Sequence, residues 1–155
     1  NEFVWITTVM SLNYAFASLS QSIDTFEQAK KQPSVAVYRD SQHESLLREK
    51  NFSNLDPNSG ETNARMLAYG RVSAWYSSIP EAQWQWKIQN LSPPFILGEN
   101  VHTQPIWLAG SKDFPKELVP VFRRVLREMK SDGSYERIYR DYFGFPSSPF
   151  EVPEN

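Results

Sequence analysis

The segment VAVYRDSQHE, residues 35–44, combines the pattern of a strand with that of a helix start. Its first four residues, with Ser34 before them, form a short apolar run typical of a buried strand. Ser41 and Glu44 have the spacing of a capping box, which predicts a helix from residue 41 to about Lys50. A strand, a turn and a helix in succession form the unit from which α/β sheets are built. The segment therefore favours an α/β fold.

The same unit recurs on both sides of this segment. Upstream, the spacing of Asp24 and Glu27 predicts a capping box and a helix that ends near Lys31, before Pro33. Downstream, Gly70 follows a helical pattern, at the position where helices commonly end in a left-handed conformation. We expect further helices at 62–69 and 80–89, strands at 54–56, 72–77, 95–97 and 104–109, and a turn at 57–60.

The first part of the chain carries no charged residue between Phe3 and Ile23. A segment of that length is sufficient for a membrane-spanning helix. However, polar side chains recur through it, and no basic cluster flanks it. Two buried strands, at 3–7 and 13–17, with a polar turn between them, account for the segment better.

An amphipathic helix is predicted near the C-terminus. Its basic residues occupy a solvated face, and its apolar residues recur at the spacing of the opposite face. The apolar residues are Leu118, Val121, Phe122, Val125, Leu126 and Met129. We expect Gly133 to end this helix and Ser134 to cap a second one. The tail at 145–155, which contains three prolines, is expected to be extended.

Composition limits the classes of function. Of the 155 residues, 40% are hydrophobic and 14% are aromatic, which is enough apolar surface for a folded core and argues against global disorder. The formal net charge of −2 is unlike the basic surface that a nucleic-acid-binding protein needs, so we expect no nucleic-acid partner. The absence of cysteine excludes disulfides, thiolate metal sites and cysteine nucleophiles.

The sequence offers little material for catalysis. His43 and His102 are its only histidines, they lie far apart in the chain, and each is expected to be solvated. No nucleophile elbow, zinc-protease motif, phosphate-binding loop or dinucleotide fingerprint is present. We therefore expect no catalytic residue, no metal site and no cofactor.

The turn at residues 38–42 is the strongest candidate site. It lies at the carboxyl end of a predicted strand and at the N-terminus of the next helix, where open α/β sheets bind ligands and where backbone N–H groups favour an anion. Ser41 and Gln42 would add side-chain donors, and Arg39 would add positive charge. The alternative is that Ser41 only caps the helix and that Arg39 is solvated. The spacing leaves both interpretations open.

Three segments occur in the order and spacing of a known set of motifs. VAVYRDSQ at 35–42 is similar to V-G-V-x-x-G-[ST]-[ST], and LAYGRVSA at 67–74 is similar to L-x-x-G-R-[IV]-D-A. KSDGSYERIYRDYFG at 130–144 is similar to K-x-D-G-[ST]-x-x-x-I-Y-x-x-Y-F-G. On these residues, the chain from Ile23 to Gly144 resembles the bacterial extracellular solute-binding proteins of family 3, a periplasmic amino-acid-binding-like group.

The resemblance implies a periplasmic-binding-protein-like (type II) fold, in which two α/β lobes joined by two crossover strands close on a small solute. Lobe 2 would be a three-layer sandwich with a mostly parallel sheet. The division it implies is a lobe 1 strand and crossover at 1–19, lobe 2 at 20–103, a return strand and C-terminal helices of lobe 1 at 104–144, and the tail at 145–155. The first part of lobe 1 has no counterpart here, so we expect an incomplete lobe 1 and a fragment of the full protein.

The resemblance also assigns residues to the cleft. Tyr38, Ser41 and Gln42 would line its lobe 2 side, with Ser41 and the adjacent amides facing an anionic group. The family's ammonium-binding Asp falls at Ser78, and a neutral hydroxyl does not replace a carboxylate as the partner of a positive amine. Asp40 stands where the family usually has Gly. Both departures argue against a standard α-amino-acid ligand.

The function implied is that of a non-catalytic periplasmic protein that binds a small polar solute, such as an amino acid or an anion, for an ABC-type importer. One alternative is the ligand-sensing domain of a membrane signalling protein. Another is a dehydratase-type enzyme on the same scaffold, for which His43 and Glu44 are the nearest acid or base candidates. A structural or interaction role is the remaining alternative. Exposed lobe 1 surfaces would favour a homodimer.

Overall fold

The computed structural model describes residues 3–143, so the predicted tail at 145–155 lies outside the described residues. The chain separates into two compact units. Asn13–Thr103 forms one unit, which we call the α/β unit. The described residues up to Leu12 and from Gln104 onward form the second, which we call the terminal unit.

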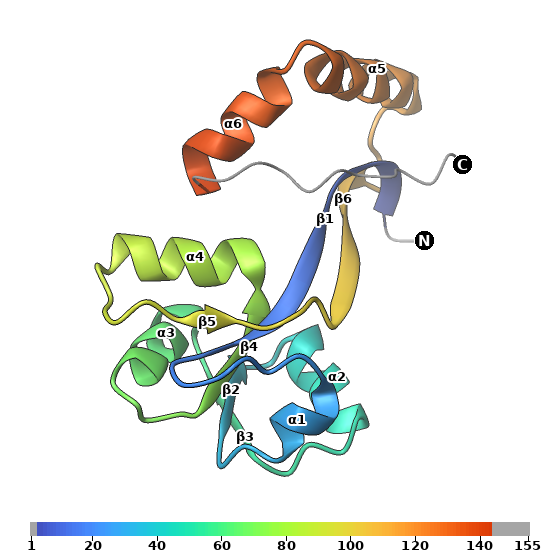
Figure 1. The fold of residues 1–155 in the computed structure, drawn as a ribbon. Coiled ribbons are helices and arrows are strands. Elements are labelled where there is room, and N and C mark those ends of the chain that lie inside the picture. Colours follow the sequence, from blue (N-terminus) through green and yellow to red (C-terminus); the bar gives the residue numbers. More distant parts are fainter. Residues whose placement is uncertain (1–2, 144–155) are drawn as a thin grey trace. The chain divides into compact units, whose positions relative to one another are not determined.

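The α/β unit is built on a sheet whose central strands are parallel (Figure 1). Its strands are β1 (Phe3–Ser18), β2 (Val35–Tyr38), β3 (Leu55–Asn58), β4 (Ala74–Ser78) and β5 (Ile96–Leu97). The order is β3-β2-β4-β1-β5, with β2 parallel to both β3 and β4, and β1 antiparallel to β4 and β5. Strands and helices alternate along the chain, which confirms the α/β class.

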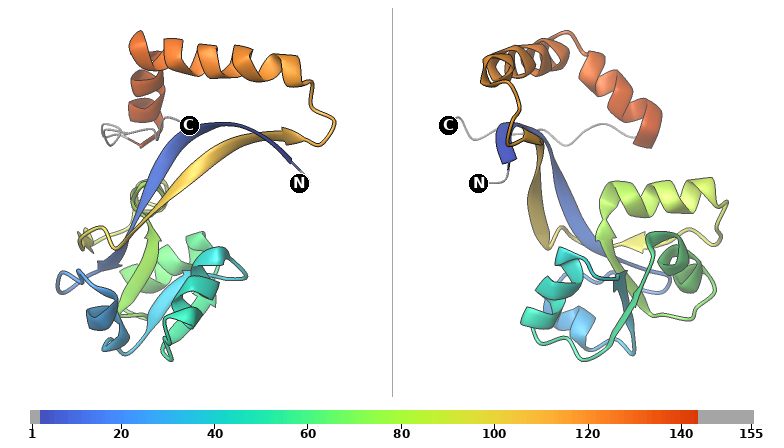
Figure 2. Two further views of the ribbon diagram at one scale, coloured as in Figure 1. Left: turned by 90° about the vertical axis from the view of Figure 1, so that its right-hand side faces the viewer. Right: turned by 180° about the vertical axis from the view of Figure 1, so that it is seen from behind.

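Four helices complete the α/β unit. They are α1 (Phe26–Lys30), α2 (Gln42–Glu49), α3 (Gly60–Ala68) and α4 (Ile79–Ile88). Helices α1 and α2 cover one face of the sheet, and α3 and α4 cover the other (Figure 1 and Figure 2). This arrangement is the expected three-layer sandwich.

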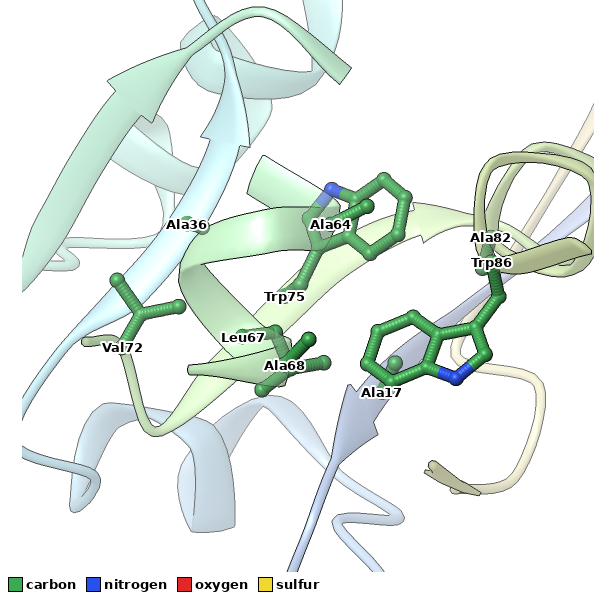
Figure 3. Close-up of a cluster of buried hydrophobic side chains, with 9 residues drawn as sticks. All are labelled: Ala17, Ala36, Ala64, Leu67, Ala68, Val72, Trp75, Ala82 and Trp86. Atoms are coloured by element: carbon green, nitrogen blue, oxygen red, sulfur yellow. The ribbon is translucent and has the colours of Figure 1, made fainter. Parts of the chain in front are cut away.

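The face covered by α3 and α4 holds a core of small residues around two tryptophans. Trp75 comes from β4 and Trp86 from α4, and both are buried (Figure 3). The indole N–H of Trp86 donates to the carbonyl oxygen of Pro93 at 3.2 Å, which satisfies its one polar group. The other members of this core are Ala17, Ala36, Ala64, Leu67, Ala68, Val72 and Ala82. Small side chains on both the strands and the helices leave room for the indole rings.

The opposite face is aromatic. Phe16 from β1 lies 5.1 Å from Tyr76 of β4, measured between ring centroids, and Phe26 and Phe52 pack around them. Alternate residues of β2, Val35 and Val37, are fully buried beside this cluster. Successive residues of a strand point to opposite faces, so each strand contributes to both cores.

The prediction of two strands at 3–7 and 13–17 with a polar turn between them is wrong. Residues 3–18 form one strand, β1, which pairs with β4, β5 and β6 (His102–Ser111). Pairing to neighbours satisfies backbone N–H and C=O groups along the strand, so a polar middle does not require a turn. Most of its middle residues are only partly buried, which suits their polar side chains.

The expected turn at 57–60 is also wrong, because Pro57 and Asn58 belong to β3. Strand β3 lies at the edge of the sheet, where a proline costs no ladder hydrogen bond on its open side. The helix that follows is capped by Ser59 and begins at Gly60. Gly70 has φ of 66°, as its position after a helix predicted.

The cap of α1 differs from the prediction by one residue. Thr25, not Asp24, is the N-cap, and its hydroxyl accepts from the amide of Gln28 at 3.1 Å. The Gln28 side-chain oxygen in turn accepts from the amide of Asp24 at 2.6 Å. Gln28 therefore takes the reciprocal role that the sequence analysis assigned to Glu27.

The terminal unit carries a 3-10 turn at Lys116–Leu118 and the two predicted C-terminal helices, α5 (Val119–Ser131) and α6 (Ser134–Phe143). Gly133, with φ of 80°, separates them. Ser134 is not the cap of α6 but lies within it, and Asp132 accepts from the Ser134 amide at 2.8 Å. Arg123 ties α5 to β1 within this unit, because its Nε donates to the Ile6 carbonyl oxygen at 2.6 Å.

Apolar side chains of the terminal unit are exposed. Each of Leu118, Val121, Phe122 and Val125 is about 40% exposed, although together they form the apolar face of α5 and of the turn that precedes it. Trp5 and Trp107, whose rings lie 6.0 Å apart, are exposed on β1 and β6. Within residues 3–143, every helix is too short or too polar to span a bilayer.

Gly98→Ala should destabilise the α/β unit. A Cβ at residue 98 would overlap the backbone carbonyl of Ile23, which cannot move as a flexible side chain can. We expect the free energy of unfolding to fall by about 1–3 kcal/mol, the usual cost of overpacking. Urea denaturation measures this, with Glu99→Ala at the exposed neighbouring residue as the control. Equal stability of the two variants would contradict the close approach of these segments.

Candidate functional site

Three helices begin at the same edge of the sheet. Because β2, β3 and β4 are parallel, their carboxyl ends lie together, and α2, α3 and α4 follow them directly. We call this region, residues 38–42, 58–60 and 77–81, the carboxyl edge. Each helix has a serine N-cap whose hydroxyl accepts the amide three residues on, at 3.2, 3.2 and 3.3 Å for Ser41, Ser59 and Ser78. Helix N-termini carry partial positive charge and N–H groups without intrahelical partners, so the edge suits an anion.

The predicted site residues of the β2–α2 turn lie at this edge, but Arg39 is engaged elsewhere. Its Nε and Nη2 donate to the carbonyl oxygen of Pro57 at 3.1 and 2.8 Å. Its guanidinium is therefore held beside β3. Tyr38 is half-exposed and Gln42 is exposed, so both side chains are accessible at the edge.

Ser41 works as a cap in this structure. Its hydroxyl donates to the carbonyl oxygen of Tyr38 at 2.6 Å and accepts from the amide of Glu44. Asp40 has φ of 55°, in the left-handed region, and its amide donates to Glu44 Oε2 at 2.8 Å. The Asp40 backbone thus has a conformation that glycine adopts without strain. An aspartate in place of the family's usual glycine must hold this left-handed conformation at a cost in backbone strain.

Glu44 is ionised and paired. Arg48 donates to its Oε1 from Nε at 2.9 Å and from Nη2 at 2.6 Å. The hydrogen bonds from Arg48, and then the one from the Asp40 amide, hold the pKa of the Glu44 carboxyl below its ordinary value. A carboxyl with a lowered pKa is a poor proton donor near neutral pH. Glu44 is therefore a poor candidate for the general acid of a dehydratase-type enzyme.

The two histidines lie near the same tyrosine and are half-buried, contrary to the expectation that each is solvated. The rings of His43 and His102 lie 4.3 and 5.8 Å from the ring of Tyr14, and both are half-buried. Burial, and then the charge of His102, lower the pKa of His43. His43 is therefore neutral at pH 7. No local sequence pattern signals this pairing, because β1 brings Tyr14 between two distant segments.

Tyr76 lies beside this cluster and is fully buried. Its ring is 5.7 Å from Tyr14 and 6.1 Å from His43. Burial raises the pKa of its phenol, so the hydroxyl stays protonated. Among the described residues, the Tyr76 hydroxyl has no hydrogen-bond partner.

Ser78 is buried and lies opposite Tyr14 in the β1–β4 ladder. Its hydroxyl caps α4, and three residues on is Glu81, which sequence reasoning did not identify. The Glu81 carboxylate accepts from the Ser77 hydroxyl at 3.2 Å. Burial raises the pKa of Glu81, and burial together with the charge of Glu81 raises the pKa of Tyr14. The spacing of Ser78 and Glu81, identical to that of Ser41 and Glu44, was the available signal.

A separate hollow in the α/β unit does not include these residues. It has a volume of about 470 Å³ and lies where α1 begins and α2 ends. Its lining is Thr25, Phe26, Glu27, Lys30, Lys50 and Asn51. Over residues 3–143, no three His, Asp or Glu side chains are arranged to hold a metal ion.

The sequence matches no family model and no curated protein. Solved structures do match its fold. An ancestral arginine-binding protein bound to glutamine aligns with a TM-score of 0.71 and 23% identity, over 92% of this chain and 64% of that one. A histidine kinase sensor domain with similarity to periplasmic binding proteins aligns with a TM-score of 0.74 and 16% identity, over 94% and 65%.

A third structure belongs to glutathione import in Gram-positive bacteria through GshT and the cystine ABC importer TcyBC of Streptococcus mutans. It aligns with a TM-score of 0.74 and 15% identity, over 97% of this chain and 66% of that one. The chain therefore spans less than two thirds of the length of these three structures. The periplasmic-binding-protein-like fold expected from the three motifs is confirmed.

Substitutions at Asp40 should separate backbone strain from charge. Asp40→Ala should lower the free energy of unfolding by about 1–2 kcal/mol, because alanine is disfavoured in the left-handed region. Asp40→Gly should be at least as stable as the wild type, and Asp40→Asn, which tolerates this conformation, should stay close to it. Urea denaturation of the three variants provides the comparison. A glycine variant less stable than the alanine variant would contradict the assignment.

Proposed function

We propose that this chain is part of a periplasmic solute-binding protein that holds a small polar solute at the carboxyl edge. The observation that carries the proposal is the convergence of three serine-capped helix N-termini at the ends of β2, β3 and β4. In open α/β sheets this is the position at which ligands bind. The fold of the three aligned structures supports the same role.

The start of α2 would hold an anionic group of the solute. The first-turn amides of α2 point along the helix axis toward the edge, and the helix dipole favours negative charge there. In this arrangement the Ser41 hydroxyl turns its proton from the Tyr38 carbonyl oxygen to the solute. Gln42 donates as well, and the half-exposed ring of Tyr38 covers the apolar part of the solute. Ser78 contributes its hydroxyl to the floor of the site. Arg39 acts through its charge and not by direct contact, since Pro57 holds its guanidinium.

The role we propose for the edge is binding. Of the two acid or base candidates, Glu44 is ionised and held by Arg48, and His43 is half-buried against Tyr14 with a lowered pKa. A dehydratase needs a group that donates a proton near neutral pH, and neither group meets that need. In the periplasm, the protein would pass the solute to the membrane permease of an ABC-type importer.

The second candidate function is a ligand-sensing domain of a membrane signalling protein. It is favoured by the alignment with a histidine kinase sensor domain, which covers 94% of this chain. Both functions use the carboxyl edge to bind the solute. They differ in the partner, because an importer permease receives the solute itself, whereas a signalling domain responds to its binding. The gene sequence on either side distinguishes them, because a sensor is continuous with a membrane segment and a signalling domain.

Isothermal titration of the 155-residue chain against amino acids, organic anions and oligopeptides tests the proposed function. We expect binding of a solute that carries a carboxylate, and a loss of about tenfold or more in affinity in Ser41→Ala, since a hydrogen bond to a charged group contributes about 1.5–3 kcal/mol. Ser45→Ala, one turn further along α2, is the matched control and should bind normally. Absence of binding across the panel, or unchanged binding in Ser41→Ala, would overturn the proposal.

We also propose that the chain forms a homodimer through the terminal unit. The exposed apolar face of α5, together with Trp5 and Trp107, is the kind of patch that buries itself against a second copy. Size-exclusion chromatography with light scattering should give twice the chain mass, and Phe122→Glu should give a single-chain mass. A wild-type chain that remains monomeric at millimolar concentration would contradict this proposal.

A further inference from the structure

Glu81 occupies a confined position at the carboxyl edge. It is the third residue of α4, and its Oε2 accepts from the Ser77 hydroxyl at 3.2 Å. Its Oε1 lies against the backbone of Gly60, so closely that a Cβ at residue 60 would overlap this oxygen. The carboxylate is thus lodged between the end of β4 and the start of α3, in a space that a glycine leaves open.

Glu81 differs from the other first-turn glutamates in having no cation. In each of α1, α2 and α3 the first-turn glutamate forms an ion pair with a residue three or four positions on; the pairs are Glu27–Lys30 at 2.7 Å, Glu44–Arg48 at 2.6 Å and Glu61–Arg65 at 2.7 Å. The residue four positions after Glu81 is Gln85, which accepts a hydrogen bond from Gln89 at 3.0 Å. Across the part of the chain that the structure describes, no Lys, Arg or His forms an ion pair with Glu81.

Two tyrosines lie near this carboxylate. Tyr38, half-exposed, approaches the same glycine, with its Cδ2 3.8 Å from the position of a Cβ at Gly60. Tyr14 lies across the ladder from Ser78, and the charge of Glu81 contributes to its raised pKa. A carboxylate attracts a positively charged nitrogen through Coulomb attraction, and a nearby aromatic ring adds to that attraction through its quadrupole.

An unpaired and partly buried carboxylate also costs free energy. Water solvates it incompletely, and no cation of residues 3–143 is paired with it, which is why burial raises the pKa of Glu81. A ligand that brings a positive charge to this position would recover that cost on binding. A structural carboxylate gains nothing from remaining unpaired, whereas a binding group must keep its partner's place open.

We propose that Glu81 is the residue that binds a positively charged amino or guanidino group of the ligand. The inference rests on the proposed function and specifies its ligand class. The charge that Ser78 lacks is supplied one helical turn further along α4. The ligand would then carry a cationic group near Glu81 and an anionic group near the start of α2.

Three probes and three variants test this assignment. The probes are L-arginine, agmatine, which has the cationic groups but no carboxylate, and succinate, which has carboxylates but no amine. We expect Glu81→Gln to lower the affinity for L-arginine and agmatine at least tenfold in isothermal titration, and to leave succinate binding unchanged. Gly60→Ala should weaken agmatine binding too, because the new Cβ displaces the carboxylate while its charge remains. Glu61→Gln is the matched control, since Glu61 is exposed and paired with Arg65, and it should bind all probes normally.

The outcomes separate this inference from the proposed function. If succinate binds, and Ser41→Ala weakens that binding, while agmatine fails to bind or binds Glu81→Gln as well as the wild type, the cation assignment is overturned and the anion site stands. If neither these probes nor any member of the wider panel binds the wild type, both are overturned.

Stability provides a second readout that needs no ligand. A carboxyl whose pKa is raised on folding holds more protons in the folded state, so its contribution to stability declines as pH rises above its ordinary value of 4.5. Glu81→Gln removes that decline and should be more stable than the wild type at pH 7. A role limited to capping α4 predicts a less stable variant, and that result would overturn the assignment.

Discussion

The parallel pairing of β2 with β3 and β4 is the constraint on which the site depends. Val35 lies in register with Leu55 on one side and with Ala74 on the other, so the three strands end together. Each strand is followed within a few residues by a helix, and the helix starts are therefore brought to one edge without any long loop. The two cores on either face of the sheet, around Trp75 and around Phe16, hold this register. A slip of one residue would exchange the faces of β2 and move Val35 and Val37 into the core around Trp75, where Ala36 now packs.

Electrostatics at this edge is a balance of fixed partial charges and carboxylates. The three helix N-termini provide positive potential, and the first-turn glutamates of α2 and α4 provide negative charge close to it. Arg48 neutralises Glu44, so the start of α2 is left with the potential of its backbone amides. Among the residues that the structure describes, Glu81 has no such partner, and the start of α4 is therefore the more negative side. An edge that is positive at one helix and negative at another, within one α/β unit, is suited to a solute that carries both charges.

Much of this could be predicted from local sequence, because strand, cap and helix patterns depend on neighbouring residues. The Ser41–Glu44 cap and the left-handed Gly70 follow from such patterns, and both are present. The continuity of β1 could not be predicted, since the hydrogen bonds that carry it through its polar middle come from distant strands. The sequence also could not predict that His43 and His102 lie near Tyr14, because this contact too joins distant segments of the chain. The contrast between Glu44 and Glu81 was in part available, because Arg48 and Gln85 occupy equivalent positions in the two helices. The fit of the Glu81 carboxylate against Gly60 required the structure.

Residue-resolved NMR tests the central claim most directly, because it locates the solute without assuming where it binds. Amide shifts of the isotopically labelled 155-residue chain would be followed during titration with L-arginine. We expect the largest shift changes at residues 39–43, at 60–61 and at 78–82, on the three helix starts of the carboxyl edge. Shift changes concentrated in the terminal unit, or in the hollow between the start of α1 and the end of α2, would contradict the claim.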